Sequence, residues 1–540
     1  MNTTLHLQAL HRNQTIHPDP ATDPRGLADL LAFHGLPLNT RCAQNGCCES
    51  CTVQLDRGSL KETISGNPIT HPGPLLACRA EWIPGTEIAL TIPSRSLLAR
   101  DAVAADDFQI SVPVGNSPLF SGEFGLAVDI GTTTVVVLLA ELATGRILTR
   151  ASGFNQQVGL GDDVLARIGL CYKNPGMVIR LQRAICEETL APLALEACAK
   201  ASIPPERISG MAVAGNTAML HLLFGEDPSP LGVVPFTPRF LDHRIRGAHS
   251  LGFCDFPDMP VHALPGLAAY VGADIAAGLY ATGLHDSPGP ALFVDVGTNG
   301  EIALLKEGRL YACATAAGPA FEGCSLSCGM RATEGAVEGI ALSLDQNGQI
   351  AIHLQTIGHL PPEQSPGFCG SAYIDFLAQA RAAGILMENG RFDPKHVAAN
   401  PALFQDEENG RAMRLTEGEP PLRITESDLA ILLQSKAAIA AGIQTLLERE
   451  RLAGVPRLYL AGGFGMHLDV PHAIACGLLP GFLPSQVEVV GNTSLGGAYL
   501  AMLDRSVLKE LTRLQTRTTI VELNLDPEFE NRYIDNLTLA

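Results

Sequence analysis

The sequence predicts a multidomain α/β protein, and three observations support this fold class. The chain has 540 residues, which is too long for one hydrophobic core and typical of about three or four domains. Four cysteines lie within residues 42–51, in a region of short apolar segments. From residue 124 the pattern changes to two similar strand–turn–strand units, each with Asp, Gly and Thr in its turn. We therefore expect a small Cys-rich domain followed by a larger α/β part.

Composition and charge limit the classes of function. The chain is 46% hydrophobic and 17% charged, which is a globular composition, and its net charge of −19 argues against a nucleic-acid partner. We find no apolar run near the roughly 18 residues needed to span a bilayer. The N-terminus lacks a basic stretch followed by an apolar segment, so no export signal is expected. The 14 cysteines are therefore expected in a reducing cytoplasm, where close Cys spacings indicate metal sites.

Residues 1–95 predict a small β-grasp domain. Alternating apolar residues indicate strands, and a run that ends at a glycine before a proline indicates a helix. The expected elements are a hairpin over 3–10 and 14–17, a helix over 26–35, a strand over 52–56, the segment 75–80 and a last strand over 87–92. The Cys-rich loop lies between the helix and the second pair of strands.

The spacing of the cysteines selects the expected ligands. Five residues separate Cys42 from Cys48, two separate Cys48 from Cys51, and Cys78 lies 27 positions further on. Plant-type [2Fe–2S] ferredoxins use C-x4-C-x2-C with a distant fourth Cys, and a set that starts at Cys47 fits this pattern less well. The set Cys42, Cys48, Cys51 and Cys78 resembles the five-residue variant of vertebrate-type and bacterial [2Fe–2S] ferredoxins. A four-cysteine zinc site is the alternative, although such sites prefer two short CxxC pairs.

The cysteine loop also departs from the ferredoxin pattern. Ala43, Gln44 and Glu49 stand where that family usually has glycines, which let backbone N–H groups approach the sulfides. Cys47 occupies a variable position and is expected to bind nothing. The segment after this domain carries mixed charge and then several Pro and Gly, which suits a connecting segment; a small dimerisation element, and hence a homodimer, is the alternative.

Two matching hairpins predict a phosphate-binding device. Segments 124–142 and 291–314 each contain an apolar strand, a turn with Asp, Gly and Thr, and a second strand. Glycine brings backbone N–H groups close to phosphate oxygens, threonine adds donors, and the carboxylate holds hydrated Mg²⁺. A third segment, 457–465, is a buried strand that runs into paired glycines, which leave space for a base or ribose. Two copies of the hairpin suggest duplicated lobes that face one nucleotide.

The order of these motifs resembles the ASKHA superfamily of acetate and sugar kinases, heat-shock chaperones and actin. The resemblance implies that 129–133 and 295–301 form two phosphate loops and that 462–465 is the adenosine motif, with ATP and Mg²⁺ as ligands. The implied catalytic residues are Asp129, Asp295, Glu301 and Glu322. The implied nucleotide-binding residues are Gly131, Thr132, Thr133, Asn216, Gly297, Thr298, Asn299, Gly318, Gly462, Gly463 and Gly465.

Two neighbouring features leave alternatives open. Glu322 either faces the nucleotide or an attacking water, or lies in a tight loop whose glycines serve packing. Cys324 and Cys328 have ligand-like spacing, but a second cluster would need more ligands, so buried thiols are expected.

Two helix starts are also expected from capping residues. Asp162 or Asp163 is expected to cap a helix after the first lobe. The segment 425–450 begins with a capping-box pattern and is expected to be a core helix beside the adenosine strand.

The chain from Cys42 to Ala498 resembles the reductive activators of corrinoid-dependent enzymes. It shares with them "VDIGTTT", "AGNTAM", "DVGTNGE", "AAGPAFEG" and "AGGFG" in one order. The resemblance implies a ferredoxin-type domain (1–95), a linker (96–123), a middle domain that is the first lobe (124–206) and a C-terminal ASKHA ATPase domain (207–540).

The same resemblance implies a function. ATP would drive delivery of one electron from the [2Fe–2S] cluster to the Co(II) corrinoid (cobalamin) of a methyltransferase or corrinoid protein, restoring Co(I). An upstream low-potential donor would reduce the cluster. The alternatives are a small-molecule kinase or phosphotransferase with a redox-regulatory domain, and a nucleotide-gated redox sensor.

Overall fold

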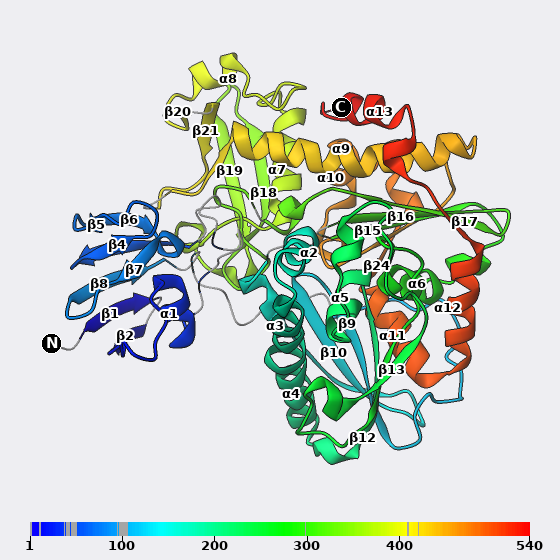
Figure 1. The fold of residues 1–540 in the computed structure, drawn as a ribbon. Coiled ribbons are helices and arrows are strands. Elements are labelled where there is room, and N and C mark those ends of the chain that lie inside the picture. Colours follow the sequence, from blue (N-terminus) through cyan, green and yellow to red (C-terminus); the bar gives the residue numbers. More distant parts are fainter. Residues whose placement is uncertain are drawn as a thin grey trace. The chain divides into compact units, whose positions relative to one another are not determined.

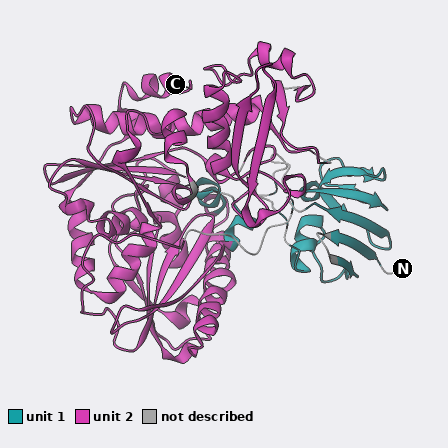
Figure 2. Cartoon of the chain, turned by 180° about the vertical axis from the view of Figure 1, so that it is seen from behind, with its two compact units in different colours: residues 1–100, 156–170 teal, residues 101–155, 171–540 magenta. Residues whose placement is uncertain are grey.

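The computed structural model describes residues 3–9, 12–36, 38, 44, 51–93, 96, 106–161, 163–297, 299–323, 325–407, 410–418 and 421–539 (Figure 1). The chain forms two compact units, residues 1–100 with 156–170 and residues 101–155 with 171–540 (Figure 2). Both helices and sheets contribute throughout, so the prediction of a multidomain α/β protein is confirmed.

The N-terminal part of the first unit is a mixed sheet with one helix. The sheet has the order β2-β1-β8-β3-β6, in which β1 pairs antiparallel with β2 and parallel with β8. The elements are β1 (Thr4–Ala9), β2 (Arg12–Ile16), α1 (Leu27–Phe33), β3 (Thr52–Arg57), β6 (Gly73–Leu76) and β8 (Glu87–Ile92), with a second sheet of β4 (Leu60–Glu62), β5 (Pro68–Ile69) and β7 (Ala80–Trp82). Leu27, Leu30 and Leu31 of α1 share one hydrophobic core with the strands. The predicted elements in 1–95 all form.

The second unit contains two six-stranded sheets of similar design. The first has the order β11-β10-β9-β12-β14-β13, and the second has the order β24-β23-β15-β16-β17-β25. The first comprises β9 (Phe124–Ile130), β10 (Thr134–Glu141), β11 (Ile147–Phe154), β12 (Ile208–Gly215), β13 (Arg244–Gly247) and β14 (Pro260–Ala263). The second comprises β15 (Ala291–Val296), β16 (Gly300–Lys306), β17 (Arg309–Thr315), β23 (Leu458–Ala461), β24 (Val487–Gly491) and β25 (Thr518–Ile520).

The two sheets place an aspartate at equivalent positions. β9 and β15 each have an antiparallel hairpin partner on one side and a parallel strand on the other. The second-to-last residue of each strand is an aspartate, Asp129 in β9 and Asp295 in β15. Because both strands end in tight turns, the two carboxylates stand where the backbone leaves each sheet.

Helices α6 (Ala273–Ala281) and α11 (Thr493–Leu503) pack against each other between the sheets. α11 packs on β9 and β12, and Gly278 of α6 lies against Phe293 of β15. A Cβ atom on Gly497 would lie 2.4 Å from the Ala277 carbonyl oxygen, so the close approach of the two helices requires glycine there. This pair of helices ties the two lobes together.

The remaining elements surround these sheets. They are α2 (Val164–Lys173), α3 (Gly176–Ile185), α4 (Ala191–Ala201), α5 (Thr217–Leu223), β18 (Val337–Leu344), β19 (Ile350–Thr356), α7 (Gly370–Ala382), α8 (Pro394–Ala399), β20 (Phe404–Glu407), β21 (Gly410–Arg414), β22 (Arg423–Thr425), α9 (Glu426–Arg449), α10 (Val470–Ala475), α12 (Ser506–Arg517) and α13 (Phe529–Asp535).

The longest described helix, α9, is a core helix, as predicted for 425–450, but its main strand contacts are not with the adenosine strand β23, beside which the sequence places it. Thr425 and Asp428 form the expected capping box, and the helix packs on β16 and β17. No apolar run long enough to span a bilayer was found in the sequence. In the structure, α9 is long and apolar enough to cross a membrane by length and composition. However, 78% of its most apolar window is buried inside the fold, which is the ordinary condition of a core helix.

Candidate functional site

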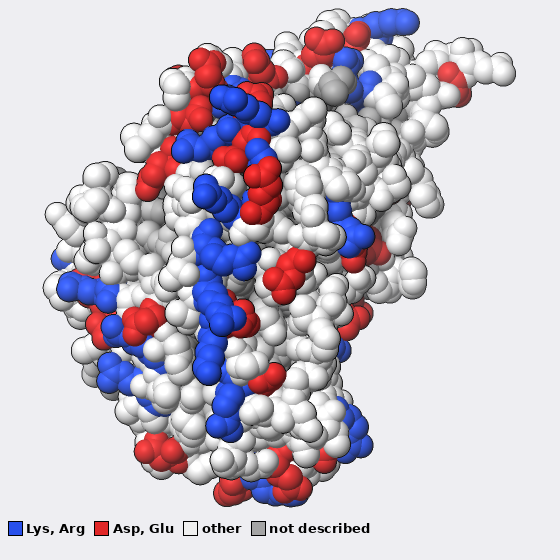
Figure 3. Space-filling model, turned by 90° about the vertical axis from the view of Figure 1, so that its right-hand side faces the viewer, with Lys and Arg blue, Asp and Glu red and all other residues white. Residues whose placement is uncertain are grey.

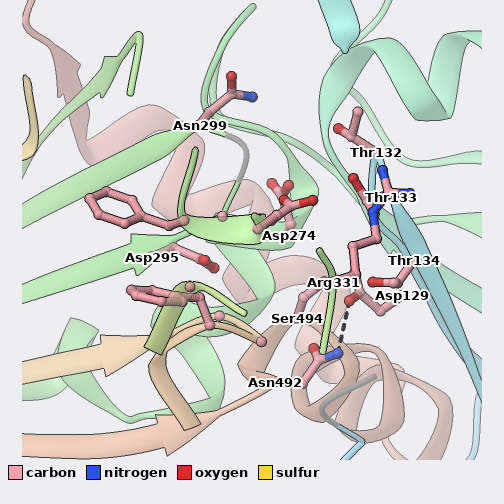
Figure 4. Close-up of a pocket in the computed structure, with 18 of the residues that line it drawn as sticks. Asp129, Thr132, Thr133, Thr134, Asp274, Asp295, Asn299, Arg331, Asn492 and Ser494 are labelled. Atoms are coloured by element: carbon pink, nitrogen blue, oxygen red, sulfur yellow. Dashed lines mark hydrogen bonds between the residues drawn. The ribbon is translucent and has the colours of Figure 1, made fainter. Parts of the chain in front are cut away.

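A cavity of about 220 Å³ lies where the turns of the two large sheets meet. Figure 4 shows Asp129, Asp274 and Asp295 pointing into it, with Thr132, Thr133 and Thr134 at one wall. The predicted residues that line it are Asp129, Gly131, Thr132, Thr133, Asn216, Asp295, Gly297, Asn299, Glu301, Glu322, Gly462 and Gly463. The fold thus brings together residues that are more than 330 positions apart in the sequence.

The first turn of this cavity is fixed by backbone and amide hydrogen bonds. The Gly131 amide donates to the Thr134 carbonyl at 2.9 Å, and a Cβ on Gly131 would lie 2.6 Å from that oxygen. Buried Asn155 donates its side-chain amide to the Gly131 carbonyl at 3.0 Å and its backbone amide to the Thr133 carbonyl at 2.9 Å. Asn216, which caps α5, donates to the Thr132 hydroxyl at 3.0 Å. The turn is therefore held rigidly around its threonines.

Asp129 is held by the start of α11. Asn492 donates its side-chain amide to Asp129 Oδ2 at 2.9 Å, and the Ser494 hydroxyl donates to Oδ1 at 2.6 Å (Figure 4). Asn492 also caps α11, because its Oδ1 accepts from the Leu495 amide. Burial nevertheless raises the pKa of Asp129, and the two hydrogen bonds only partly oppose this effect.

The second hairpin adds two carboxylates. Asp295 stands directly opposite Glu301 in the register of β15 and β16. Like charges in such a cross-strand pair destabilise a sheet, so a structural role does not explain the pair. Gly462 lies beside them with φ +95°, and a Cβ there would lie 2.5 Å from Asp295 Oδ1. The paired glycines after β23 therefore leave the Asp295 carboxylate open to the cavity.

Asp274, in the first turn of α6, completes a group of four carboxyl groups, of which Glu301 is buried and the other three are half-buried. Burial raises its pKa to about 7, and the nearby Asp129 charge adds to the effect. Burial, together with the charges of Asp274 and Asp129, raises the pKa of Asp295 to about 8. The pKa of Glu301 is also raised, first by burial and then by Asp274 and Asp295. Such a group needs bound cations before all four can ionise near neutral pH.

Arg331 is the one basic residue among the described residues that line the cavity. Its guanidinium carbon lies 5.1 Å from the centroid of the Phe154 ring, and its buried Nε has no hydrogen-bond partner in the described chain. No described carboxylate forms an ion pair with it. Since a buried guanidinium N–H without a partner is costly, Arg331 is poised to receive an anion.

The lining also includes a pair of aromatic rings. Phe321 and Phe464 stack with centroids 5.1 Å apart and an interplanar angle of 23°. The start of α7 also lines the cavity, through Cys369, Gly370 and Ser371. The lining of the cavity therefore combines a flat apolar surface with carboxylates, hydroxyls and one guanidinium.

The structure separates some predicted residues from the cavity and adds others. Among the described lining residues it places neither Gly318 nor Gly465, and Thr298 lies outside the described residues. The lining residues that sequence reasoning missed are Thr134, Phe154, Asp274, Phe321, Arg331, Ala332, Cys369, Gly370, Ser371, Asn492, Thr493 and Ser494, whereas Phe464 lies within the predicted adenosine motif, 462–465. One available signal was the repeated Gly-Asn-Thr, at 215–217 and 491–493, because both asparagines cap a helix and bind the first turn.

Cys51 and Cys78 come together in the N-terminal sheet region. Cys51 is buried at the start of β3, and the segment that contains Cys78 follows β6, the antiparallel partner of β3. A hydrogen bond with the Cys78 side chain lowers the pKa of the Cys51 thiol to about 6, against the effect of burial. A thiolate is the form that binds metal. Cys42, Cys47 and Cys48 lie outside the described residues, as do Ala43 and Glu49.

The other candidate residues have plainer surroundings. Cys328 is buried, as expected, while Cys324 lies outside the described residues. Asp163 accepts a hydrogen bond from the Ala166 amide at 2.7 Å and thus caps α2, as predicted for Asp162 or Asp163; Asp162 is not described. Within the described ranges no three His, Cys, Asp or Glu side chains are arranged to hold a metal ion by themselves.

Two family models match the second part of the chain. Residues 124–287 match the RACo middle region, and residues 289–540 match the C-terminal domain of RACo, the ASKHA domain. The predicted ASKHA fold of the C-terminal part is thereby confirmed.

Named relatives cover most of the chain. The corrinoid activation enzyme RamQ of Eubacterium limosum is 35% identical over 430 residues, which is 76% of this chain and 70% of that protein. The [Co(II) methylated amine-specific corrinoid protein] reductase of Methanosarcina barkeri is 25% identical over 77% of each chain. A solved structure, the reductive activator for corrinoid, iron–sulfur protein, has 28% identity and a TM-score of 0.72 and covers 99% of this chain and 98% of its own. The chain therefore belongs to the RACo family of reductive activators of corrinoid proteins.

Proposed function

We propose that this protein uses ATP to drive the transfer of one electron to the Co(II) corrinoid of a partner protein, which restores Co(I). One observation carries this proposal. A single RACo-family chain contains both the Cys51–Cys78 thiol pair, which suits an electron-carrying cluster, and a cavity that suits a magnesium nucleotide. By their names, one relative is a corrinoid activation enzyme and the other is a reductase of a Co(II) corrinoid protein. The same cavity would suit a kinase, but these relatives favour the activator.

The electron carrier is proposed to be a [2Fe–2S] cluster in a β-grasp ferredoxin-type domain over residues 1–95. Its ligands would be Cys42, Cys48, Cys51 and Cys78. The contact between the Cys51 and Cys78 thiols fits this group, because two neighbouring sulfurs, one with its pKa lowered to about 6, suit a shared metal centre. When bound, such a cluster supplies single electrons at low potential. An upstream low-potential donor would reload it.

The nucleotide is proposed to bind between the two large sheets with Mg²⁺. One or two of the carboxylates of Asp129, Asp295 and Glu301 would hold the hydrated ion together with the nucleotide phosphates, since Mg²⁺ usually binds proteins through one or two carboxylates plus substrate phosphates. Asp274, the fourth carboxyl group of the cavity, would orient a water molecule or stay protonated as a donor. Glu322 lines the cavity as well and is proposed to act at its edge. The raised pKa values support this assignment, because a cation in place of protons would relieve the repulsion.

Phosphate and base would be recognised by different walls. We assign the phosphates to the rigid turn at Gly131, Thr132 and Thr133, to its counterpart at Gly297, Thr298 and Asn299, and to Arg331. The stacked Phe321 and Phe464 beside Gly462 and Gly463 offer an apolar surface for the adenine ring. Asn216 would act by holding the Thr132 hydroxyl in place. Gly318 and Gly465 would shape the adjoining backbone.

The two sheets offer a route from ATP to movement. Asp129 and Asp295 belong to different lobes, and each is a direct neighbour of a strand end. A nucleotide that contacts both would bias the lobes toward a closed arrangement, because it binds that state more tightly. Closure would change the surface offered to the corrinoid protein and so favour release of the electron.

The domain organisation follows as part of the proposal. Residues 96–123 would connect the ferredoxin-type domain to two lobes that arose by duplication. The five-strand order that the sheets share, β11-β10-β9-β12-β14 and β17-β16-β15-β23-β24, supports this, while the sixth strands lie at opposite edges. A boundary at 206/207 would separate α4 from β12, although β12 pairs with β9. We therefore propose that the first lobe extends to residue 287, where the match to the middle region ends. A homodimer and a cytoplasmic location stay predictions.

One experiment tests the function directly. Reduced protein is mixed with a Co(II) corrinoid protein, with and without MgATP, and Co(I) is followed by its absorbance. We expect Co(I) to accumulate only with MgATP. Equal accumulation without ATP would refute the coupling, and ATP turnover stimulated by a metabolite instead of a corrinoid protein would favour a kinase. Nucleotide binding with neither ATPase activity nor electron delivery would favour a redox sensor. Iron and zinc contents measured on the same sample decide between the cluster and a zinc site.

A further inference from the structure

Helix α12 presents a basic face on an acidic protein. Its basic residues recur every four positions and are all exposed, whereas Val507, Leu511 and Leu514 are buried on the other side. Exposed Arg309 adjoins the same helix, because the Arg517 guanidinium donates to the Gly308 carbonyl at 2.7 Å. The α12 stripe is defined as Arg309, Arg505, Lys509, Arg513 and Arg517. In Figure 3, which views the side of the molecule that carries α12, Lys and Arg side chains form a narrow band down this face.

The charge of the α12 stripe is largely unneutralised. Of its members only Arg513 forms an ion pair with a described carboxylate, that of Glu510, at 2.5 Å. Arg505 and Arg517 donate to backbone carbonyls, which carry no net charge. The whole chain has 37 basic and 56 acidic residues and is therefore negatively charged, whereas the five basic residues of the α12 stripe make this part of its surface positive. Such a row creates a positive potential that attracts an acidic surface.

The stripe is built on elements that also form the nucleotide cavity. The chain enters α12 from α11, whose first residues bind Asp129 through Asn492 and Ser494. It leaves α12 into β25, which pairs with β17, and β17 pairs with β16 at Glu301. A partner seated on α12 would thus contact an element that is linked to the nucleotide site through α11 on one side and through β25, β17 and β16 on the other. This continuity favours the partner whose activation depends on ATP.

We propose that the α12 stripe docks an acidic surface of the corrinoid protein that this chain activates; the inference rests on the proposed function. An α-helix of 12 residues is about 18 Å long, which suits the central part of an ordinary protein–protein interface. Extended polyanions such as DNA or an anionic membrane would also meet the −19 charge of the chain around this narrow row. A second copy docked by two-fold symmetry would bring stripe against stripe and so oppose like charges.

The test reverses charge on the stripe. The double variant Lys509→Glu/Arg513→Glu is compared with Lys173→Glu/Lys395→Glu, which makes the same change in net charge at exposed positions on α2 and α8 that form no ion pair with a described residue. Binding of a purified Co(II) corrinoid protein and formation of Co(I) are both measured at 50 and 500 mM NaCl. We expect the stripe variant to lose about tenfold in association rate at low salt and to approach the wild-type rate at high salt, while the control stays within about twofold.

Folding and alternative ligands are controlled in the same series. Lys509→Gln/Arg513→Gln should give a smaller loss than the reversal, and all variants should keep the wild-type melting temperature. Unchanged corrinoid-protein binding by a folded stripe variant would overturn the proposal. It would also fall if the reversal instead abolished binding of a 20-base-pair DNA duplex or phosphatidylserine vesicles, or only changed the oligomeric state.

The two readouts separate this proposal from the function on which it rests. Stripe-dependent binding without any Co(I) would leave the docking surface standing and refute the electron transfer. Normal binding and normal Co(I) formation by Lys509→Glu/Arg513→Glu, as by the control Lys173→Glu/Lys395→Glu, would refute the docking surface and leave the function standing. If the wild-type chain bound none of the corrinoid proteins of its own organism, both would fall.

Discussion

Burial raises the pKa both in the thiol pair of the N-terminal domain and in the carboxyl group cluster of the large cavity, yet the net pKa shifts of the two sites are opposite. Contact with Cys78 lowers the pKa of Cys51 to about 6, although the thiol is buried. In the cavity, burial and mutual repulsion raise the pKa values of Asp274 and Asp295 to about 7 and about 8. Donors of hydrogen bonds outweigh desolvation in the first site, and desolvation outweighs them in the second.

This difference suggests how each site treats a cation. A thiolate that forms near neutral pH can bind iron permanently, because little proton competition remains. A carboxyl cluster that retains protons until a cation arrives binds its metal weakly and reversibly, which suits a substrate complex such as MgATP. The chain would therefore keep one resident metal group and exchange the other with each nucleotide.

The largest expected effect is at the resident site. Cys78→Ser should remove most of the visible absorbance and bound iron, since serine does not replace the thiolate that Cys51 contacts. Cys47→Ser, five positions after the proposed ligand Cys42 and next to the proposed ligand Cys48, is the matched control and should leave the spectrum nearly intact. Absorbance and iron content of the purified variants check this. Equal iron in both variants would remove Cys78 from the ligand set.

The exchangeable site should respond differently. Asp295→Asn keeps the shape of the side chain but removes a carboxylate from the proposed magnesium site, so ATPase activity should fall by about 100-fold or more. Iron content should not change, because the resident site uses other residues. Measuring ATP turnover and iron on the same preparation checks both expectations. Loss of iron would indicate a folding defect, and undiminished turnover would exclude Asp295 from the site.

Much of the fold could be predicted from the sequence because the local signals were strong. The hairpin around residue 300, the strand before Gly462 and the capping box at Thr425 all form as expected, since apolar periodicity and turn residues act within a few positions. The N-terminal strands were equally clear. Their pairing was less so: β1 lies beside β8, about 80 residues away, and no local pattern encodes that contact.

The cavity shows where such reasoning stops. Asp129 and Asp295 stood out because each ends an apolar strand in a Gly-Thr turn. Asp274 did not, because an acidic residue in the first turn of a helix is ordinarily explained by the helix dipole. Arg331 likewise reaches the cavity only through tertiary packing. Long-range convergence, not residue type, makes these side chains part of the site.

Replacing Arg331 tests whether its guanidinium contributes to ATP binding or turnover in the cavity. Arg331→Ala removes the one described cation at its wall, so the KM for ATP should rise, or kcat fall, by about 10- to 100-fold, as for the loss of a hydrogen bond to a charged group. Arg331→Lys should restore part of the loss, because charge returns without the planar fork. Steady-state ATPase kinetics check this. If alanine and arginine gave equal kinetics, the guanidinium would serve packing against Phe154 alone.

The smallest effect expected is a pH dependence of stability that belongs to the cavity. An acid whose pKa is about 4 when unfolded and about 8 when folded holds, between these pH values, a proton that the unfolded chain lacks. Raising the pH through this window therefore destabilises the folded state, and the contribution present at low pH is lost by about pH 8. Without Mg²⁺ and nucleotide, the melting temperature of the wild type should fall by a few degrees relative to Asp295→Asn between pH 5 and pH 8.

Cation binding should cancel this difference. In Asp295→Asn the amide resembles the protonated acid at every pH. Subtracting the melting temperatures of this variant from those of the wild type, pH by pH, therefore removes the effect of every other titrating group that both proteins share, including Cys51. Adding Mg²⁺ with ADP should flatten the difference curve, because a cation replaces the protons that the carboxyl cluster otherwise needs. Melting curves recorded by differential scanning fluorimetry measure both effects. A difference curve that is flat without Mg²⁺ would mean that Asp295 ionises in the empty cavity as easily as in water, and the contrast between a proton-retaining cavity and a thiolate-forming Cys site would then be lost.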